Sequence, residues 1–152
     1  MTVLRILALL LLGVLAGAPV AAGDKIVPRA GHAIAPLPTD EAVQKGMLVI
    51  RDLIATNRSL ITHRRMPPDH ALRFAAQVKV EADKILATTS LSGEALEKLR
   101  ILLEEIVAGI GAVAKPTDGA TSADGLARAD EALARYPDEF DHPGWEPLNA
   151  TE

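Results

Sequence analysis

Apolar side chains recur every three or four positions in four successive segments of the chain, which is the spacing of amphipathic helices. The first three segments span about Thr39–Arg65, Pro68–Thr89 and Gly93–Ala114, and the fourth begins at Ser122. None of the four shows the strict alternation of a half-buried strand. Because short connections join consecutive helices as antiparallel neighbours, the pattern predicts an all-α fold, an antiparallel up-down-up-down four-helix bundle over residues 39–142.

Each predicted helix carries one apolar stripe that is wide enough to face a shared core. The most regular stripe belongs to the third segment: Leu96, Leu99, Leu103, Ile106, Ile110 and Val113. Asn57 falls on the stripe of the first segment, where a polar residue is expected to set the register or to pair with another polar group. Two acidic pairs, Glu104-Glu105 and Asp130-Glu131, lie off the stripes, so we expect them to be solvated.

Capping residues and prolines predict where the helices end. Thr39, Ser92 and Ser122 are expected to be N-caps, because their hydroxyl oxygens can accept hydrogen bonds from the free N–H groups of a first turn. Pro137 has no N–H and disfavours helical geometry at the residue before it. The fourth helix is therefore expected to reach about Arg135 and then to break or kink before a last turn.

The first 22 residues have the pattern of a secretory signal peptide. Arg5 precedes an apolar run over residues 6–15, which is shorter than the roughly 20 residues that a membrane-spanning helix needs. The small residues at positions 20–22 favour cleavage after Ala22. We therefore expect a periplasmic protein with no stable membrane insertion after cleavage. Residues 23–38, which hold three prolines, are expected to form an extended arm, and residues 143–152 a non-helical tail.

Composition narrows the classes of function. The chain has no cysteine, which excludes disulfides, thiolate metal sites and covalent attachment of haem. Sixteen Lys and Arg against 20 Asp and Glu give a net charge of −4, and the basic residues are scattered except at Arg64-Arg65. No nucleic-acid interface is therefore expected. No nucleophile elbow or phosphate-binding loop occurs in the sequence, so we expect the protein not to be an enzyme.

The connection between the first two helices holds the densest group of polar residues. His63, Met66 and His70 fall within eight positions there. Imidazole and thioether groups are ligands of copper, so these three residues are a candidate copper site. The alternative interpretation is an exposed basic turn, in which His63 interacts with the C-terminal end of the first helix.

A second candidate site combines residues that are distant in the sequence. Met47 lies on the inward stripe near the start of the first helix, and His142 follows the fourth helix, so an up-down bundle places both at the same end. In helix order, export and the placing of these two residues, the chain resembles cytochrome b562 and, more loosely, the cytochrome c′ group. The resemblance implies non-covalent haem b with Met47 and His142 as axial ligands. It also implies a place for Arg135 or Tyr136 near a haem propionate.

The function expected from the sequence is that of an exported, non-enzymatic helical bundle, with cytochrome-like electron transfer to a redox partner if haem is bound. One alternative is a periplasmic adaptor or chaperone that uses an exposed apolar groove to bind a protein partner. Another is the copper-binding protein described above. A structural role for the tail is a further alternative, in which Trp145 folds back over the open end of the bundle and Pro143-Gly144 supplies the turn.

Overall fold

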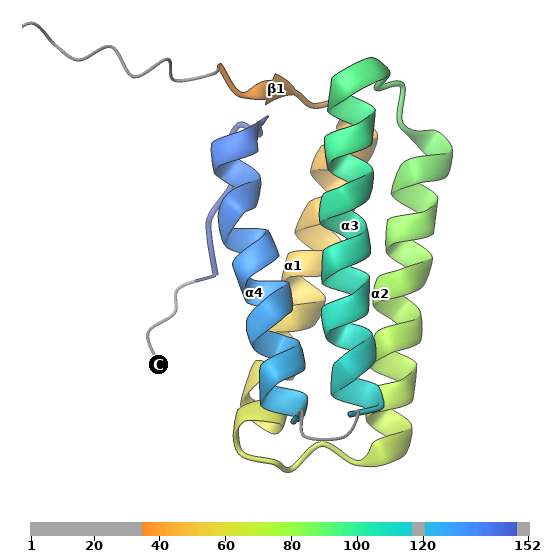
Figure 1. Ribbon diagram of the computed structural model, residues 1–152, viewed down its shortest axis with the longest axis vertical. Helices are drawn as coiled ribbons and strands as arrows, with labels where there is room; N and C mark the ends of the chain where they lie inside the picture. The colour runs from red at the N-terminus through yellow and green to blue at the C-terminus, as the bar shows by residue number, and fades with distance from the viewer. Residues whose placement is uncertain (1–34, 117–120, 149–152) are drawn as a thin grey trace, which may run out of the picture. The chain divides into compact units, whose positions relative to one another are not determined.

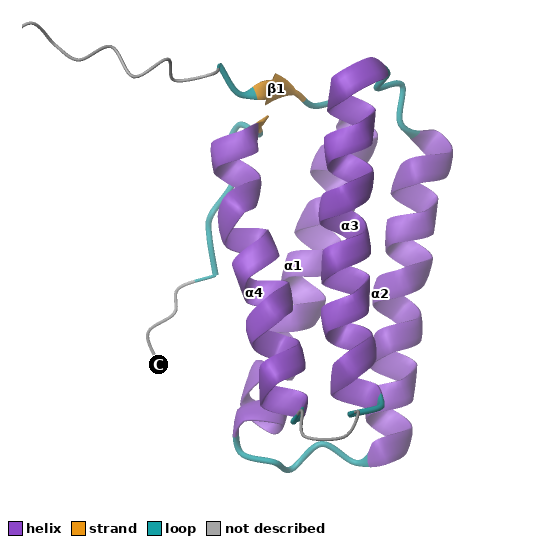
Figure 2. Ribbon diagram, in the orientation of Figure 1, coloured by secondary structure: helices purple, strands orange, loops and turns teal. Residues whose placement is uncertain are grey.

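The computed structural model describes residues 35–116 and 121–148. Most of them belong to four helices: α1 (Glu41–Thr62), α2 (Pro68–Thr88), α3 (Gly93–Ala114) and α4 (Ser122–Glu139). Figure 1 shows these helices side by side along one long axis, and Figure 2 shows how little of this part of the chain is strand. The predicted all-α bundle is confirmed. The expected signal peptide, residues 23–34 of the arm and residues 149–152 of the tail lie outside the described residues.

The core lies where the four predicted stripes meet. Each helix packs against two others, so that α1 contacts α2 and α4 while α3 contacts the same two helices. The largest fully buried side chains are Tyr136, Phe74, Phe140, Met47, Ile50, Ile54, Ile85, Leu99, Leu102, Leu103, Ile106 and Ile110. Apolar burial of this kind is the main favourable term in folding, so the stripes account for the bundle. No helix in the described part of the chain has both the length and the hydropathy needed to span a bilayer.

Two of the predicted N-caps are wrong by one residue. Asp40, not Thr39, caps α1, and its carboxylate accepts the Val43 N–H at 2.9 Å. The Thr39 hydroxyl instead donates to the carbonyl of Asp141. Likewise Thr121, not Ser122, caps α4. In each pair of neighbours, either side chain could act as an N-cap. Tertiary contacts decide which of the two does so, and the sequence does not show those contacts.

The N-terminal ends of α4 and α3 are capped in different ways. Thr121 and Asp124 form a reciprocal capping box, which satisfies two N–H groups at the start of α4. The Ser122 hydroxyl is used elsewhere, since it donates to the carbonyl of Val113 at the end of α3. The position predicted for the cap of α3 is confirmed as Ser92, although its side chain makes no capping hydrogen bond.

A break or kink was expected at Pro137, and the break is wrong, because α4 continues through this residue to Glu139. Pro137 lies in the last turn, so its missing N–H removes a single bond, the one that would reach the carbonyl of Leu133. The rings of Tyr136 and Phe140 stack at 5.3 Å between centroids and are both buried. The Phe140 N–H still bonds to the Tyr136 carbonyl. Packing and this bond hold the last turn in place.

A short parallel pairing joins the two ends of the bundle domain. The strands are β1 (Leu37–Pro38) and β2 (Phe140–Asp141), and Leu37 lies opposite Phe140. This pairing was not predicted, because two residues are too few to show a strand pattern. It brings the start of α1 and the end of α4 to the same end of the bundle, which we name the strand end. The opposite end, where α1 joins α2 and where α3 ends and α4 begins, is named the loop end.

Polar residues on the stripes and flanks add specific links. Asn57 is buried and donates from its side chain to the carbonyl of Leu53, so it is satisfied within its own helix. Glu104, Glu105 and Glu131 are exposed as expected. Asp130 is not fully solvated, because it pairs with Arg58 of α1 at 2.6 Å. Burial raises the pKa of Asp130, and Arg58 only partly opposes that effect.

Candidate functional site

The strand end holds a cluster of buried aromatic and imidazole groups. His142 is 9 % exposed and Tyr136 is fully buried. The Tyr136 hydroxyl lies 2.9 Å from Nδ1 of His142. Tyr136 comes from the last turn of α4, and His142 follows β2, so the turn of the chain after α4 places the imidazole back over the phenol. This contact fixes one ring nitrogen of His142 inside the protein.

Trp145 completes this cluster. Its ring lies 4.6 Å from that of Tyr136 and 5.2 Å from that of His142, measured between centroids. The backbone N–H of Trp145 donates to the carbonyl of His142, and Gly144 has a φ of +79°, which glycine adopts without strain. The expectation that Trp145 folds back through a turn at Pro143-Gly144 is confirmed. The indole N–H of Trp145 is buried without a hydrogen-bond partner among the described residues.

Arg51 of α1 holds the tail from the other side. Its guanidinium carbon lies 5.7 Å from the centroid of the Trp145 ring, within the range of a cation–π contact. Its Nη1 donates to the carbonyl of Glu146 at 3.1 Å. We name Arg51, Tyr136, His142 and Trp145 the C-terminal cluster. Its members come from α1, α4 and the tail, so it ties the tail to the bundle.

The buried setting changes how the two titratable rings ionise. Burial and then the nearby charge of Arg51 lower the pKa of His142 below its usual 6.5. Burial, and to a smaller degree the negative charge of Asp40, raise the pKa of Tyr136. At neutral pH the imidazole is therefore neutral and the phenol keeps its proton. A neutral ring nitrogen and a protonated hydroxyl can share one hydrogen bond without any buried charge.

The structure places the two residues of the haem hypothesis at the strand end. Met47 is fully buried in the core, and His142 is committed through Nδ1 to Tyr136. Neither residue lines the cavity at the loop end, the groove between α1 and α2, or two smaller cavities along α4. Tyr136 and Phe140 fill the end of the core, and Trp145 packs over Tyr136. Haem ligation by Met47 and His142 stays a prediction, and in the arrangement described it requires the tail to move.

The contacts of Arg135 and Glu139 bear on two hypotheses, a haem propionate contact and a di-iron site. Arg135, named for a propionate contact, pairs instead with Glu105 of α3. Glu139 and His142 have the Glu-x-x-His spacing that di-iron bundles present from a helix. Here α4 ends at Glu139, whose carboxylate faces Arg135 at 4.0 Å, while His142 contacts Tyr136. No group of three His, Cys, Asp or Glu side chains suited to a metal ion occurs in the described segments.

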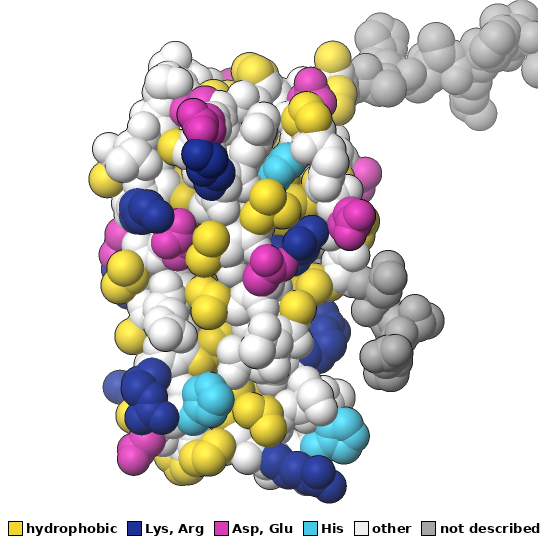
Figure 3. Space-filling model, turned by 180° about the vertical axis from the view of Figure 1, so that it is seen from behind, with side chains coloured by type: hydrophobic (Ala, Val, Ile, Leu, Met, Phe, Trp, Pro, Cys, Tyr) yellow, Lys and Arg dark blue, Asp and Glu magenta, His cyan; other side chains and the backbone are white. Residues whose placement is uncertain are grey.

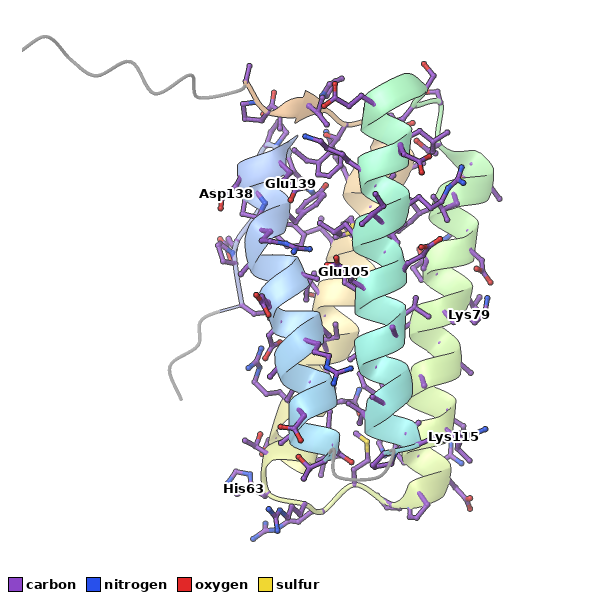
Figure 4. The ribbon with its side chains drawn as sticks, viewed as in Figure 1. His63, Lys79, Glu105, Lys115, Asp138 and Glu139 are labelled. Atoms are coloured by element: carbon purple, nitrogen blue, oxygen red, sulfur yellow. The ribbon has the colours of Figure 1, made fainter. Side chains whose placement is uncertain are left out.

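The three residues of the copper hypothesis lie in different settings at the loop end. His63 is exposed, and its Nδ1 lies 2.8 Å from the carbonyl of Ser59, one turn back in α1. Figure 4 shows His63 projecting outward at this end of the bundle. Met66 packs against the core, and His70 is half-buried in the first turn of α2. No contact brings the three together, and copper binding stays a prediction.

A cavity of about 440 Å³ opens at the loop end. It lies between the end of α1, the start of α2, the end of α3 and the start of α4. Its apolar wall comes from Leu60, Ile61, Met66, Pro68, Ala71 and Val113. Pockets of this volume, mostly apolar and placed between the helices of a bundle, are typical of small-molecule sites. The sequence could not show it, because its wall combines four segments that meet only in the folded chain.

Basic residues lie at and near one part of the edge of this cavity. Arg64 lines it, and Lys115 lies in sequence between two further lining residues, Ala114 and Pro116. Figure 4 shows Lys115 at the same end of the bundle as His63. Arg64, Arg65 and Lys115 form no ion pair with another described residue. The local arrangement therefore combines an apolar interior with a positive rim.

Among the described residues, two acidic groups lie near this rim, and one of them is committed to hydrogen bonds. Asp124 accepts hydrogen bonds from the N–H and hydroxyl of Thr121 at 2.6 and 2.9 Å, so its carboxylate is committed to the cap of α4. Asp69 is exposed in the first turn of α2. These two carboxylates reduce the positive potential of the rim without pairing with Arg64 or Lys115.

A shallower apolar groove of about 410 Å³ runs between α1 and α2. Val49 and Leu53 line it from α1, and Ala76 and Val80 line it from α2, with Val80 64 % exposed. Figure 3, a view from the side opposite to Figure 1, shows hydrophobic side chains spread along the length of that face. An adaptor would need a surface of this kind, but nothing in the described segments shows what covers it.

The chain matches no protein-family model, no curated protein and no solved structure. The choice among its candidate sites therefore depends on the geometry given above.

Proposed function

We propose that the protein is a non-enzymatic binding protein that takes a small amphipathic anion into the loop-end cavity. The observation that carries the proposal is the cavity of about 440 Å³ with apolar walls and Arg64 at its edge. An aliphatic chain gains free energy by burying its surface, at about 25 cal/mol for each Å² removed from water. An acid group on the same molecule would lie at the rim.

The positive charge at the rim favours a ligand whose head group is negatively charged. A guanidinium binds a carboxylate or sulfonate through paired N–H donors, and Lys115 adds a second positive charge in the same region. A neutral alcohol would gain only the apolar part, and a cation of the same chain length would be repelled. The ligand class is thus a chain of aliphatic carbons with one acidic head.

Calorimetric titration of the purified protein with dodecanoate, dodecanol and dodecyltrimethylammonium, all below their micellar concentrations, tests this proposal. The expected order of affinity is dodecanoate, then dodecanol, with the cation weakest. Arg64→Gln is expected to weaken dodecanoate binding at least several-fold and to leave dodecanol binding unchanged. Arg100→Gln, an exposed arginine of α3 outside the cavity, is the matched control and is expected to bind as the native chain does.

Ala71→Phe addresses the cavity itself, because the larger side chain would occupy its volume. Loss of binding by all three probes in a variant with unchanged helical circular dichroism is the expected result. Equal binding of dodecanoate to the native chain and to Ala71→Phe would place the ligand elsewhere and overturn the proposal.

Haem binding is the second candidate, and the position of Met47 and His142 at the same end of the bundle favours it. The supporting observation is that both side chains are buried and that His142 is neutral at neutral pH, as an iron ligand must be. The absorbance spectrum of the protein, purified and then mixed with haemin, tests it.

A further inference from the structure

We propose that the loop end of the bundle docks on an anionic lipid bilayer, with the loop-end cavity opening toward the membrane. The docking itself depends on the charges around this end of the molecule. The inference rests on the proposed function in one respect, because a bilayer is where an aliphatic acid, the ligand class proposed for the cavity, is concentrated.

The basic side chains of the described residues fall into two groups. Most of them form an ion pair with a carboxylate, namely Lys45, Arg51, Arg58, Lys79, Lys84, Lys98, Arg100 and Arg135. The others are exposed and form no ion pair with a described residue, namely Arg64, Arg65, Arg73, Lys115 and Arg128. We name the second group the unpaired basic residues.

The unpaired basic residues all lie toward the loop end. Arg64 and Arg65 follow the C-terminal end of α1, and Lys115 follows that of α3. Arg73 and Arg128 lie in the second turns of α2 and α4, and the Cα–Cβ bonds of a helix tilt toward its N-terminus, which is here the loop end. Figure 3 shows Lys, Arg and His side chains at this end, at the bottom of the view, whereas basic and acidic side chains lie next to each other higher up.

Helix stability accounts for only part of this arrangement. A positive charge is favoured close to the C-terminal end of a helix, which suits Arg64, Arg65 and Lys115. The same helix dipole does not favour a positive charge near the N-terminal end, so it does not account for Arg73 and Arg128. A separate role for this group of charges is therefore needed.

The carboxylates at the loop end do not cancel these charges. Asp69 and Asp124 lie there, and Asp118 adds a third carboxylate in the sequence between α3 and α4. The two segments 63–73 and 113–128 thus contain five Lys and Arg against three Asp, although the whole chain has a net charge of −4. The loop end is a positive region on a protein whose overall charge is negative, so an anionic surface would attract this end and repel the rest.

The cavity favours a bilayer over an acidic protein as that surface. Its apolar wall opens beside these charges, with Arg64 at its edge. Leu72, which is 44 % exposed, and the exposed Pro67 add apolar surface at the same end. Anionic lipids present negative head groups that attract Lys and Arg, and their aliphatic chains lie directly beneath. An acidic protein would complement the charges but not the apolar opening.

Co-sedimentation of the purified protein with lipid vesicles tests the docking. We expect binding to vesicles of equal parts phosphatidylglycerol and phosphatidylcholine, and no binding to vesicles of phosphatidylcholine alone. The screening length falls from about 10 Å in about 0.1 M salt to about 3 Å in about 1 M salt, so the higher concentration is expected to release the protein. This comparison uses the native chain and depends on no variant.

A double variant assigns the binding to the loop end. Arg65→Gln combined with Arg73→Gln removes two of the unpaired basic residues, neither of which lines the cavity. A basic side chain near an anionic membrane contributes a factor of about five in affinity, so the double variant is expected to bind the vesicles about 25-fold more weakly. Its calorimetric affinity for monomeric dodecanoate is expected to stay unchanged.

The matched control removes the same charge elsewhere. Lys45→Gln combined with Arg100→Gln changes two exposed basic residues nearer to the strand end, both of which form ion pairs within their own helices. This control is expected to bind the vesicles as the native chain does, because the location of the charge and not its total decides the docking.

Tryptophan fluorescence tests the orientation. Trp145, the only tryptophan of the chain, lies at the strand end, whereas Leu72 is exposed near the loop end. With a quenching spin label on the lipid head groups, the emission of the bound native chain is expected to stay constant. The variant Leu72→Trp is expected to lose part of its emission under the same conditions.

Three results would overturn the docking: no binding to the anionic vesicles, equal binding to both kinds of vesicle, and equal binding by the native chain and the loop-end double variant. Quenching of Trp145 in the native chain would place the strand end on the membrane and would also contradict it. Calorimetry separates this outcome from that of the proposed function. Dodecanoate binding without vesicle binding refutes only the docking, and vesicle binding without dodecanoate binding refutes only the proposed ligand.

Discussion

Asp40 shows how much of this fold can depend on one side chain. Its carboxylate accepts the Val43 N–H at the start of α1 and also the N–H of Ser90 and the hydroxyls of Thr89 and Ser90. The same group therefore caps one helix and fastens the connection between α2 and α3. Burial by itself raises the pKa of Asp40, but the four hydrogen bonds outweigh it and lower the pKa to about 2.

Asp40→Ala is expected to destabilise the protein by about 1–2 kcal/mol or more, because a helix cap is lost together with the link to Ser90. The folded pKa lies below the unfolded value of 3.8, so this contribution is complete above pH 3.8 and is lost as the pH falls toward 2. Urea unfolding at neutral pH and at about pH 3 measures both effects. Asp83→Ala, at an exposed site on α2, is the control.

The haem hypothesis also belongs at the scale of single residues. If Met47 and His142 bind iron, the purified protein has a Soret band or acquires one on addition of haemin. Met47→Leu is a sharper test than Met47→Ala, because it removes the thioether while it keeps the volume of a fully buried side chain. A native chain that stays colourless with haemin, or a band that survives in both Met47→Leu and His142→Ala, would contradict this ligation.

At the scale of elements, α3 and α4 approach each other through two glycines. A Cβ on Gly125 would lie 2.6 Å from the Gly109 carbonyl oxygen and 2.8 Å from the Val113 nitrogen. A Cβ on Gly109 would lie 2.8 Å from two backbone atoms of α4. These neighbours are backbone atoms, which cannot rotate away as a side chain can. The helix axes would have to separate to admit even one methyl group.

Gly125→Ala and Gly109→Ala are each expected to destabilise the protein by about 1–3 kcal/mol, the usual range for overpacking. Gly111→Ala in the same helix α3 is the matched control, because no atom lies within 4 Å of a Cβ built there. Its expected effect is a gain of about 0.5–1 kcal/mol, since alanine favours a helix over glycine. Thermal and urea unfolding measure all three, and equal effects of Gly111→Ala and Gly125→Ala would contradict the close approach.

The positions of the four helices could be predicted from the sequence, whereas their exact caps and last turns could not. Periodic residues such as Ile50, Ile54 and Leu103 face the core because helix geometry alone places them on one stripe. The cap at Asp40 and the unbroken turn at Pro137 depend on contacts with Ser90 and Phe140, which are set by the tertiary fold. The local sequence pattern therefore predicts where the helices lie, whereas contacts between different elements determine where each helix ends.

At the scale of the whole molecule, the two ends of the bundle have different character. The strand end is closed by aromatic packing around Tyr136, and the loop end holds a cavity with a basic edge. The sequence drew attention to Met66 and His142 at these ends but assigned them to metal chemistry. Neither the wall of the cavity nor the contact of Arg51 with Trp145 is encoded in a local motif, because each joins residues far apart in the chain.

Ligand binding at the loop end is expected to stabilise the whole bundle, because a ligand that binds only the folded state raises the melting temperature by mass action. Dodecanoate at about 100 times its dissociation constant is expected to add about 2.7 kcal/mol. Differential scanning fluorimetry of the native chain and of Ala71→Phe measures the shift. A shift of the same size in both proteins would mean that dodecanoate acts outside the cavity.

The parallel pairing of β1 with β2 has a mechanical consequence. The chain enters β1 and leaves β2 at opposite ends of the paired segment, where Leu37 faces Phe140 and Pro38 faces Asp141. A force that pulls the two chain ends apart would therefore slide these strands past each other, and would load their hydrogen bonds together instead of one after another. Tension along the chain would act first on the tail contacts of Leu148 and Trp145 and then on the hydrogen bonds between these two strands.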